Sequence, residues 1–189
     1  GGLVGVGTVT DSYNTGVVSG NTYIGGLVGA GTVTDSHNIG DVIGVSDVGG
    51  LVGSGAGGTV TDSYNSGNVQ CTTNNVGGLV GNAGTIVNSY NTGDVTGVSG
   101  VGGLVGYNGT ILNSSNSGTV YGDTNVGGIL GYGYDQGVVK DSYNTGKVKG
   151  NYQVGGLVGV GGYADKSYIK DSYNVGEVDG RGDVGGLVG

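Results

Sequence analysis

The chain has 189 residues, with 50 Gly, 13 Tyr and no Pro, Phe, Trp or Met, a composition that is unusual for a globular domain. The glycines do not follow the three-residue period of collagen, which excludes a triple helix, and the regular positions of Val, Ile and Leu argue against glycine-rich disorder. The net charge is −8 and residues 1–139 contain no Lys or Arg, so we expect no nucleic acid partner, because such binding needs clustered basic residues.

The first element is the motif Gly-Gly-Leu-Val-Gly, which opens the chain and recurs to its end. Eight copies start 24 to 30 residues apart, at positions 1, 25, 49, 77, 102, 127, 155 and 185, the one at 127 reading Gly-Gly-Ile-Leu-Gly. Such a period is the signature of a repeat protein. We therefore expect a single repeat domain over residues 1–189, made of seven repeats and a final partial repeat, and we interpret it as a fragment of a longer chain.

Each repeat has three pieces. The glycine motif follows an apolar residue, as in residues 24–29; a β-branched stretch leads into Asp-Ser-Tyr-Asn, as in residues 8–14; and a short Gly-x-Val-x-Gly ends the unit, as in residues 16–20. These pieces have the composition and bounds of strands and turns, and none has a helical period. The pattern predicts an all-β fold, a parallel β-helix (β-solenoid) of about seven coils with three short strands each and 24–30 residues per coil, whose neighbours share one core.

Stacked coils place equivalent residues in columns. The asparagine column contains Asn14, Asn38, Asn65, Asn91, Asn116, Asn144 and Asn174. The serine column contains Ser12, Ser36, Ser63, Ser89, Ser114, Ser142 and Ser172. The aromatic column contains Tyr13, His37, Tyr64, Tyr90, Ser115, Tyr143 and Tyr173. The aspartate column contains Asp11, Asp35, Asp62, Asn88, Asn113, Asp141 and Asp171.

These columns carry different expectations. Stacked asparagine amides can hydrogen-bond along the column, and repulsion between carboxylates indicates that the aspartate column faces solvent. A turn within Asp-Ser-Tyr-Asn leaves the direction of the other columns open. The strand at the glycine motif is apolar on both faces, with Val48 and Val52 on one and Leu51 on the other. One face supplies the core, and the other is expected to be an exposed apolar stripe, of the kind that often marks an interface, unless something covers it.

Insertions concentrate at one place in the coil. The segment between the glycine motif and the next strand varies from 1 to 7 residues, whereas the other variable segment has three or four. Solenoids commonly bind ligands at such an edge. Aromatic faces beside carboxylates suit sugars, so the candidate ligand-binding loop residues are Tyr132, Tyr134, Asp135, Tyr163 and Asp165. The alternative is that Tyr is simply the only aromatic residue other than His37 that this chain uses.

A second candidate is the integrin-type tripeptide Arg181-Gly182-Asp183, which uses the only arginine of the chain. Three-residue matches arise easily in a sequence rich in Gly and Asp, so a chance match is the alternative. The array Thr8-Val9-Thr10, repeated at residues 32–34 and 59–61, resembles the surface of ice-binding solenoids but degrades in later repeats. Ordinary β-propensity at exposed strand positions explains it equally.

The positions of the acidic residues give little indication of a metal site or a catalytic site. Calcium is a candidate ligand for loop carboxylates, since extracellular modules bind it through oxygen donors; solvated carboxylates are the alternative. The residues concerned are Asp41, Asp47, Asp94, Asp123 and Asp135. The acidic residues recur in register with the repeats and do not gather in one repeat. Glycoside hydrolysis needs two carboxyl groups on either side of one bond, and no such catalytic pair stands out. We expect no catalytic residue, no enzyme activity and no other cofactor.

Cys71 is the only cysteine, which excludes an internal disulfide framework and a cysteine-based zinc site. Six other repeats have Gly at this position, so we interpret Cys71 as a tolerated substitution at a turn. No apolar run approaches the ~20 residues that span a bilayer, so no membrane insertion is expected within this segment.

The recurring Val-Gly-Gly-Leu-Val-Gly, followed by Asp-Ser-Tyr-Asn-x-Gly-x-Val-x-Gly, resembles the GLUG-motif repeats of large bacterial surface and secreted proteins. That family includes adhesin-like proteins and the non-catalytic region of IgA-specific metallopeptidases. The resemblance covers the whole chain and implies an extracellular or cell-surface, prokaryotic, β-rich module with no catalytic residues to carry over. The His-Glu-x-x-His motif of those peptidases is absent, since His37 and Glu177 are the only His and Glu.

We expect a non-enzymatic structural or adhesin segment that acts as a stalk, a spacer or a fibre-forming repeat. One alternative is a module that binds carbohydrates or host receptors through the variable-loop edge. Another is a self-assembling filament subunit, because open end coils present unpaired strand edges. The expected partners are neighbouring repeats or copies of the chain, with glycans or host surface proteins in the binding alternative.

Overall fold

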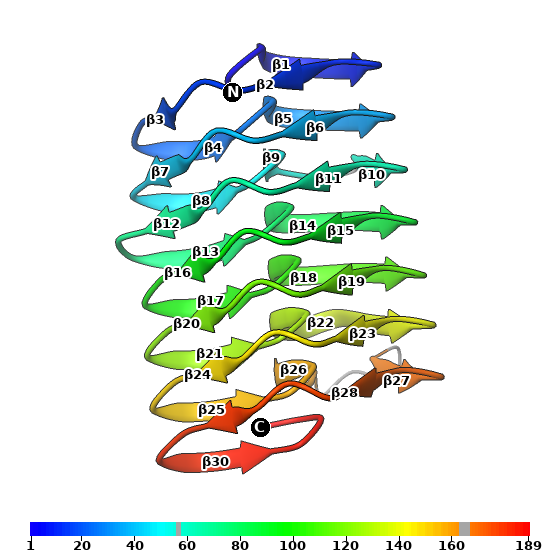
Figure 1. Ribbon diagram of the computed structural model, residues 1–189. Coiled ribbons are helices and arrows are strands. Elements are labelled where there is room, and N and C mark those ends of the chain that lie inside the picture. The colour runs from blue at the N-terminus through cyan, green and yellow to red at the C-terminus, as the bar shows by residue number, and fades with distance from the viewer. Residues whose placement is uncertain (56–57, 163–166) are drawn as a thin grey trace.

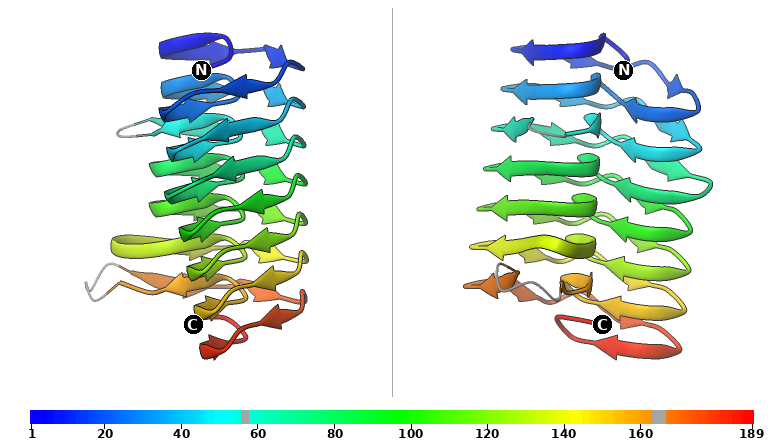
Figure 2. Two further views of the ribbon diagram at one scale, coloured as in Figure 1. Left: turned by 90° about the vertical axis from the view of Figure 1, so that its left-hand side faces the viewer. Right: turned by 180° about the vertical axis from the view of Figure 1, so that it is seen from behind.

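The chain winds into a stack of coils in which each coil lies on the one before it, with the two termini at opposite ends (Figures 1 and 2). The computed structural model describes residues 1–55, 58–162 and 167–189, with the side chains of Asp135 and Gln136 left out. Every strand pairing in this part is parallel, so the β-solenoid of about seven coils is confirmed. The described residues contain no helix, and hence none long and apolar enough to cross a membrane.

Sheet A runs along one face of the stack. In most coils its strand begins in the glycine motif and ends just before the Asp-Ser or Asn-Ser turn, and in two coils the strand is split in two. Equivalent residues keep register, such as Val9 with Val33. The strands are β1 (Val4–Thr10), β5 (Val28–Thr34), β9 (Val52–Ser54), β10 (Thr59–Thr61), β14 (Val80–Val87), β18 (Val105–Leu112), β22 (Leu130–Lys140), β26 (Val158–Val160) and β27 (Tyr168–Lys170).

Sheet B holds the Tyr-Asn pair of each repeat, in two-residue strands. They are β2 (Tyr13–Asn14), β6 (His37–Asn38), β11 (Tyr64–Asn65), β15 (Tyr90–Asn91), β19 (Ser115–Asn116), β23 (Tyr143–Asn144) and β28 (Tyr173–Asn174). Sheet C holds the central Val of Gly-x-Val-x-Gly. Its strands are β3 (Val18–Ser19), β7 (Val42–Gly44), β12 (Val69–Cys71), β16 (Val95–Thr96), β20 (Val120–Tyr121), β24 (Val148–Lys149) and β29 (Val178–Asp179).

Sheet D holds the segment that leads into the glycine motif. Its strands are β4 (Thr22–Gly25), β8 (Ser46–Gly49), β13 (Asn74–Gly77), β17 (Ser99–Gly102), β21 (Thr124–Gly127), β25 (Tyr152–Gly155) and β30 (Gly182–Gly185). A full coil therefore contributes to four sheets, so the expectation of three strands per coil was wrong. The reason is that the chain turns a corner at the second glycine and the leucine of the motif, between β4 and β5, which divides the motif between sheets D and A.

Glycine is required at this corner because the next coil passes very close. A Cβ on Gly26 would lie 2.2 Å from the carbonyl oxygen of Gly50 and 2.5 Å from Cγ of Asn38. No side chain fits at that distance, so the second glycine of the motif lets sheet B and the corner pack together.

The same corner explains why the predicted exposed apolar stripe is absent. Val48, Leu51 and Val52 are all fully buried, because the chain turns between them. Val48 joins a cluster of valines from sheets C and D. Leu51 and Val52 join a second cluster under sheet A. The core thus consists of two clusters, and neighbouring coils share each of them along the stack.

The asparagine column forms a hydrogen-bonded ladder, as predicted, and the serine column forms a second one. Asn38 donates from Nδ2 to Oδ1 of Asn65 at 2.9 Å and to the carbonyl oxygen of Gly40 at 2.6 Å. The hydroxyl of Ser36 donates to the Thr34 carbonyl at 2.6 Å and its backbone N–H donates to Oγ of Ser63 at 3.0 Å. In the inner coils these polar side chains are buried and their bonds run along the stack.

The aspartate column faces solvent, as expected. Its members also share a left-handed backbone, with φ between 46° and 51°. Asp and Asn tolerate this region better than other residues that carry a side chain, which gives the turn after sheet A its residue preference.

Candidate functional site

In the coils where it is described throughout, the insertion-rich place lies inside the sheet A strand, at a sharp bend rather than at a corner between sheets. The bend has positive φ at Ala83 and Asn108, 45° at each. Between the pairs Tyr107/Tyr132 and Gly109/Gly137 the offset from β18 to β22 changes from 25 to 28 residues. The insertion in β22 is therefore absorbed as a bulge.

Two predicted loop residues meet at this bend. The rings of Tyr132 and Tyr134 are 6.0 Å apart, and the ring of Tyr107 in the preceding coil lies 5.5 Å from that of Tyr132. Tyr134 is exposed. We call Tyr107, Tyr132 and Tyr134 the bend cluster; it offers aromatic surface but, within the described side chains, brings no carboxylate to it.

The other predicted loop residues are not placed. Tyr163 and Asp165 lie outside the described residues, and the side chain of Asp135 is not described, so the combination of aromatic rings with carboxylates stays a prediction.

The tripeptide Arg181-Gly182-Asp183 belongs to the regular coil. The backbone N–H groups of Arg181 and Gly182 both donate to the carbonyl of Asn151, at 2.9 Å each. A Cβ on Gly182 would come within 2.9 Å of the Tyr152 ring, so that ring covers the glycine. Arg181 and Asp183 are exposed, and Asp183 has a φ of 51°. The tripeptide is thus held in register rather than on a protruding loop.

A polar groove lies next to the tripeptide. It encloses about 390 Å³ and is lined by Tyr121, Gly122, Lys149, Gly150, Asn151, Asp179, Gly180 and Arg181. Tyr121, Lys149 and Asp179 are register partners on the outer face of sheet C. Alignment of the repeats places these three residues in one column, so the sequence could have indicated this polar groove. The insertion pattern did not indicate it, because these residues lie outside the insertions.

Ion pairs compensate charge in the later coils. The pKa of the Lys140 amine is raised by its hydrogen bond to Asp141, and that of Lys147 by its hydrogen bond to Glu177. The pairs are Lys140–Asp141 at 3.1 Å, Lys147–Glu177 at 2.9 Å and Lys149–Asp179 at 3.9 Å. All are exposed, so their effect on stability is small.

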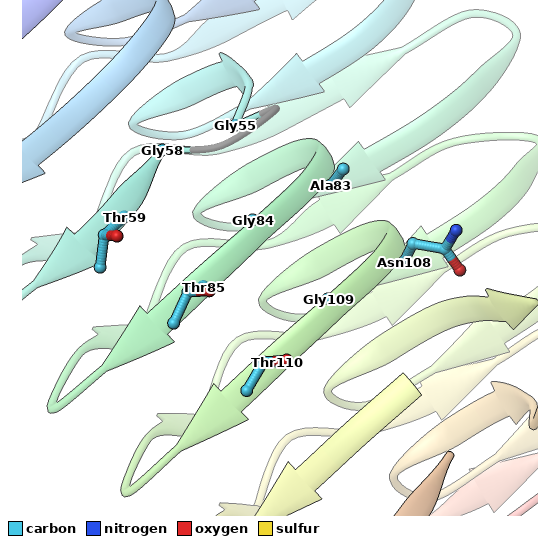
Figure 3. Close-up of a pocket in the computed structure, with 9 residues that line it drawn as sticks. All are labelled: Gly55, Gly58, Thr59, Ala83, Gly84, Thr85, Asn108, Gly109 and Thr110. Atoms are coloured by element: carbon cyan, nitrogen blue, oxygen red, sulfur yellow. The ribbon is translucent and has the colours of Figure 1, made fainter. Parts of the chain in front are cut away.

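A second hollow crosses three coils of sheet A, as Figure 3 shows. It encloses about 220 Å³ and is lined by Gly55, Gly58, Thr59, Ala83, Gly84, Thr85, Asn108, Gly109 and Thr110. Thr59, Thr85 and Thr110 lie side by side in one column, since β10, β14 and β18 pair in register. This column ends at Val138 in β22, so the threonine array is confined to the earlier coils.

Of the calcium candidates, Asp41 and Asp47 lie in one coil and Asp94 and Asp123 in two others, while the side chain of Asp135 is not described. The oxygens of the four described carboxylates have protein donors. Asp41 accepts from the N–H of Asn68, and Asp94 accepts from that of Thr119. Asp47 is buried and accepts from the amides of Asn75 and Asn82, both at 2.9 Å, and Asp123 accepts from Asn151. The structure thus gives these carboxylates a role in joining coils. In the described part of the chain no group of three metal-ligating side chains occurs.

Cys71 is buried at the corner between sheets C and D. Its Sγ lies 3.1 Å from the carbonyl oxygen of Val45 and 3.4 Å from that of Asn74. Burial, more than any other effect, raises the pKa of the thiol. The thiol therefore fills core space where the other repeats have glycine.

Comparison with known families supports the division into coils. Residues 97–121 and 122–149 each match the family model described as the GLUG motif. Each matched unit is one complete coil, with one strand from each of the four sheets. No curated protein and no solved structure matches the chain.

Proposed function

The chain contains a GLUG-motif repeat region at residues 97–149, and from this we propose that it is a non-enzymatic structural segment of an extracellular prokaryotic surface protein, serving as a stalk or spacer. The observation that carries the proposal is the hydrogen-bonded asparagine ladder along the stack. The asparagine ladder runs from Asn14 to Asn174 without interruption. Such stacking gives a rigid rod whose length is set by the number of coils.

The test is to shorten the rod by whole repeats. Deleting residues 102–154 removes two repeats in register, and the shortened chain should remain folded and lose about 9.6 Å of rod length, since each coil spans about 4.8 Å. Small-angle scattering measures the length and the cross-section. If the segment is a spacer, the parent protein keeps its function after this deletion and only the distance that the segment spans becomes shorter. Loss of a specific binding activity on deletion contradicts the spacer role.

The second candidate function is binding of a carbohydrate or a host receptor. It is favoured by the bend cluster, in which Tyr134 is exposed, and by the polar groove beside Arg181, which together offer aromatic surface and hydrogen-bonding groups. Removal of residues 134–136 leaves Tyr132-Gly133-Gly137, the same spacing as Tyr107-Asn108-Gly109, so the solenoid is kept.

Binding to a panel of glycans and matrix proteins distinguishes these surfaces. Loss of binding in the variant lacking 134–136 identifies the bend cluster, whereas loss on Asp183→Glu identifies the tripeptide. If the unaltered chain binds nothing on the panel, the binding function is rejected and the spacer proposal stands.

The third candidate is assembly through the ends of the stack. Leu3 and Leu187 are 46% and 44% exposed, whereas the equivalent Leu27 and Leu157 are fully buried. Any added coil covers these leucines, including a coil of a second copy. Sedimentation of the 189-residue chain over a range of concentrations checks this, and a monomer at the highest concentration rejects it.

A further inference from the structure

The aromatic column has one position without a ring. Ser115 in β19 is the register partner of Tyr90 in β15 on one side and of Tyr143 in β23 on the other. These three strands lie directly above one another in sheet B (Figure 1). The serine therefore stands in the row where the neighbouring coils present tyrosine.

Elsewhere in this column the rings stack from coil to coil. The centroids of His37 and Tyr64 are 4.7 Å apart with planes 1° from parallel, and those of Tyr64 and Tyr90 are 5.0 Å apart and 2° from parallel. Tyr143 and Tyr173 stack in the same way at 5.2 Å and 5°. One ring therefore fills one coil spacing. Tyr90 and Tyr143 are two spacings apart, about 9.6 Å, which leaves room for one ring between them.

Exposure of the two flanking rings agrees with this arrangement. Tyr64, which has a ring on each side, is half-buried. Tyr90 and Tyr143 each have a ring on one side only and are 43% and 39% exposed. Each therefore presents one aromatic face toward Ser115.

The polar groups beside the gap favour a neutral occupant. In these coils the aspartate column contains Asn88 and Asn113, which bond each other at 2.8 Å, and Asp141, which is paired with Lys140 at 3.1 Å. A nucleotide would bring its negatively charged phosphate to a chain of net charge −8. A single aromatic ring matches both the spacing and the polarity.

We propose that the gap at Ser115 is a binding site for an aromatic side chain of another polypeptide, which inserts between the faces of Tyr90 and Tyr143. The inserted ring completes the stack that His37, Tyr64 and Tyr90 form in the coils before it. This site is separate from the bend cluster and from the polar groove, so it neither requires nor excludes binding there.

The probe is N-acetyl-tryptophanamide, observed by NMR through its indole protons. The chain contains no Trp, so every indole signal comes from the probe. On binding, the indole resonances should shift upfield because of ring currents from the two tyrosines. Ser115→Tyr fills the gap and should abolish this shift, whereas Ser117→Tyr, two residues further on at an exposed position, should keep it.

Removing one of the two flanking rings provides a second test of the proposal. Tyr90→Ala should weaken binding about three- to tenfold, which corresponds to the loss of one stacked pair. Tyr13→Ala, at the far end of the column, should have no effect, and circular dichroism checks that each variant keeps its strands. The proposal is overturned if Ser115→Tyr binds the probe as well as the unaltered chain. It is also overturned if methyl glucoside displaces the probe completely at equal concentration, which would identify a sugar site.

Discussion

Asn65 donates from Nδ2 to Oδ1 of Asn91 in the next coil, 2.9 Å away, and both side chains are fully buried. The amide of Asn91 in turn donates to Asn116 and to the carbonyl oxygen of Gly93. One side chain thus satisfies polar groups of three coils, which makes the asparagine ladder a principal connection between the coils.

Replacing the middle of this ladder should be costly. Asn91→Ala leaves buried polar groups of Asn65, Asn116 and Gly93 without this partner, so we expect a loss of about 3 kcal/mol in the free energy of unfolding. Asn14→Ala is the matched control, because Asn14 is only half-buried and bonds a single neighbouring coil; it should cost about 1 kcal/mol. Urea denaturation measures both, and equal losses would show that the ladder adds nothing beyond local bonds.

The corner glycine should tolerate a methyl group only where no coil follows. A Cβ on Gly50 would lie 2.1 Å from the carbonyl oxygen of Gly78, whereas a Cβ on Gly186, at the same place in the last motif, meets nothing within 4 Å. Gly50→Ala should therefore destabilise by about 3 kcal/mol, and Gly186→Ala by less than about 1 kcal/mol. Thermal unfolding of the two variants compares them directly, and a Gly50→Ala chain of unchanged stability would contradict the close approach.

The aspartate column should accept Asn and reject β-branched residues. Asp35 has a φ of 46°. Asp35→Val places a β-branched residue in the left-handed region and should cost about 1–2 kcal/mol. Asp35→Asn should be neutral, since Asn88 and Asn113 occupy the equivalent turns with φ of 50° and 47°. Chemical denaturation distinguishes the two, and a similar loss for both would indicate that the carboxylate, not the backbone, matters.

Cys71 should make stability fall at high pH. Burial raises the pKa of its thiol in the folded chain, with a further contribution from the Asp47 carboxylate. Above the ordinary thiol pKa of about 8.5, the unfolded chain releases a proton that the folded chain keeps. Stability is therefore retained below this pH and decreases as the pH rises through the raised pKa.

Cys71→Ala removes this titration and serves as the control for the pH slope. Alkylation by iodoacetamide at pH 8 should be slow in the folded chain and fast in urea. Rapid alkylation without denaturant would mean that the thiol is accessible, contrary to its burial.

The sequence was sufficient for the solenoid because the repeats impose it. Once equivalent residues are stacked, a column of asparagines has few arrangements other than a ladder, and a column of aspartates has few places other than the surface. The number of strands per coil could not be read in the same way. Gly-Gly looks like part of one strand, and only the structure shows that β4 ends at Gly25, that β5 begins at Val28 and that the chain turns between them.

The candidate sites depended on geometry that the repeats do not impose. Tyr132 and Tyr134 were found from the insertion pattern, but the pattern could not show that the insertion forms a bulge within β22. The groove at Arg181 was missed because its lining comes from several ordinary coils rather than from an insertion. The gap at Ser115 was present in the aligned columns, and its meaning required the ring-to-ring distances on either side.

The stacking direction has a mechanical consequence. Hydrogen bonds between coils run along the length of the stack, and the termini lie at its opposite ends. Tension on the two ends therefore loads the bonds of one coil at a time, as in peeling, instead of loading many in shear. Each released coil adds 24 to 30 residues of extended chain, or about 80 to 100 Å. A tether of this kind lengthens in steps under pulling force and rewinds when the force is removed, because every coil left in place is a template for the next.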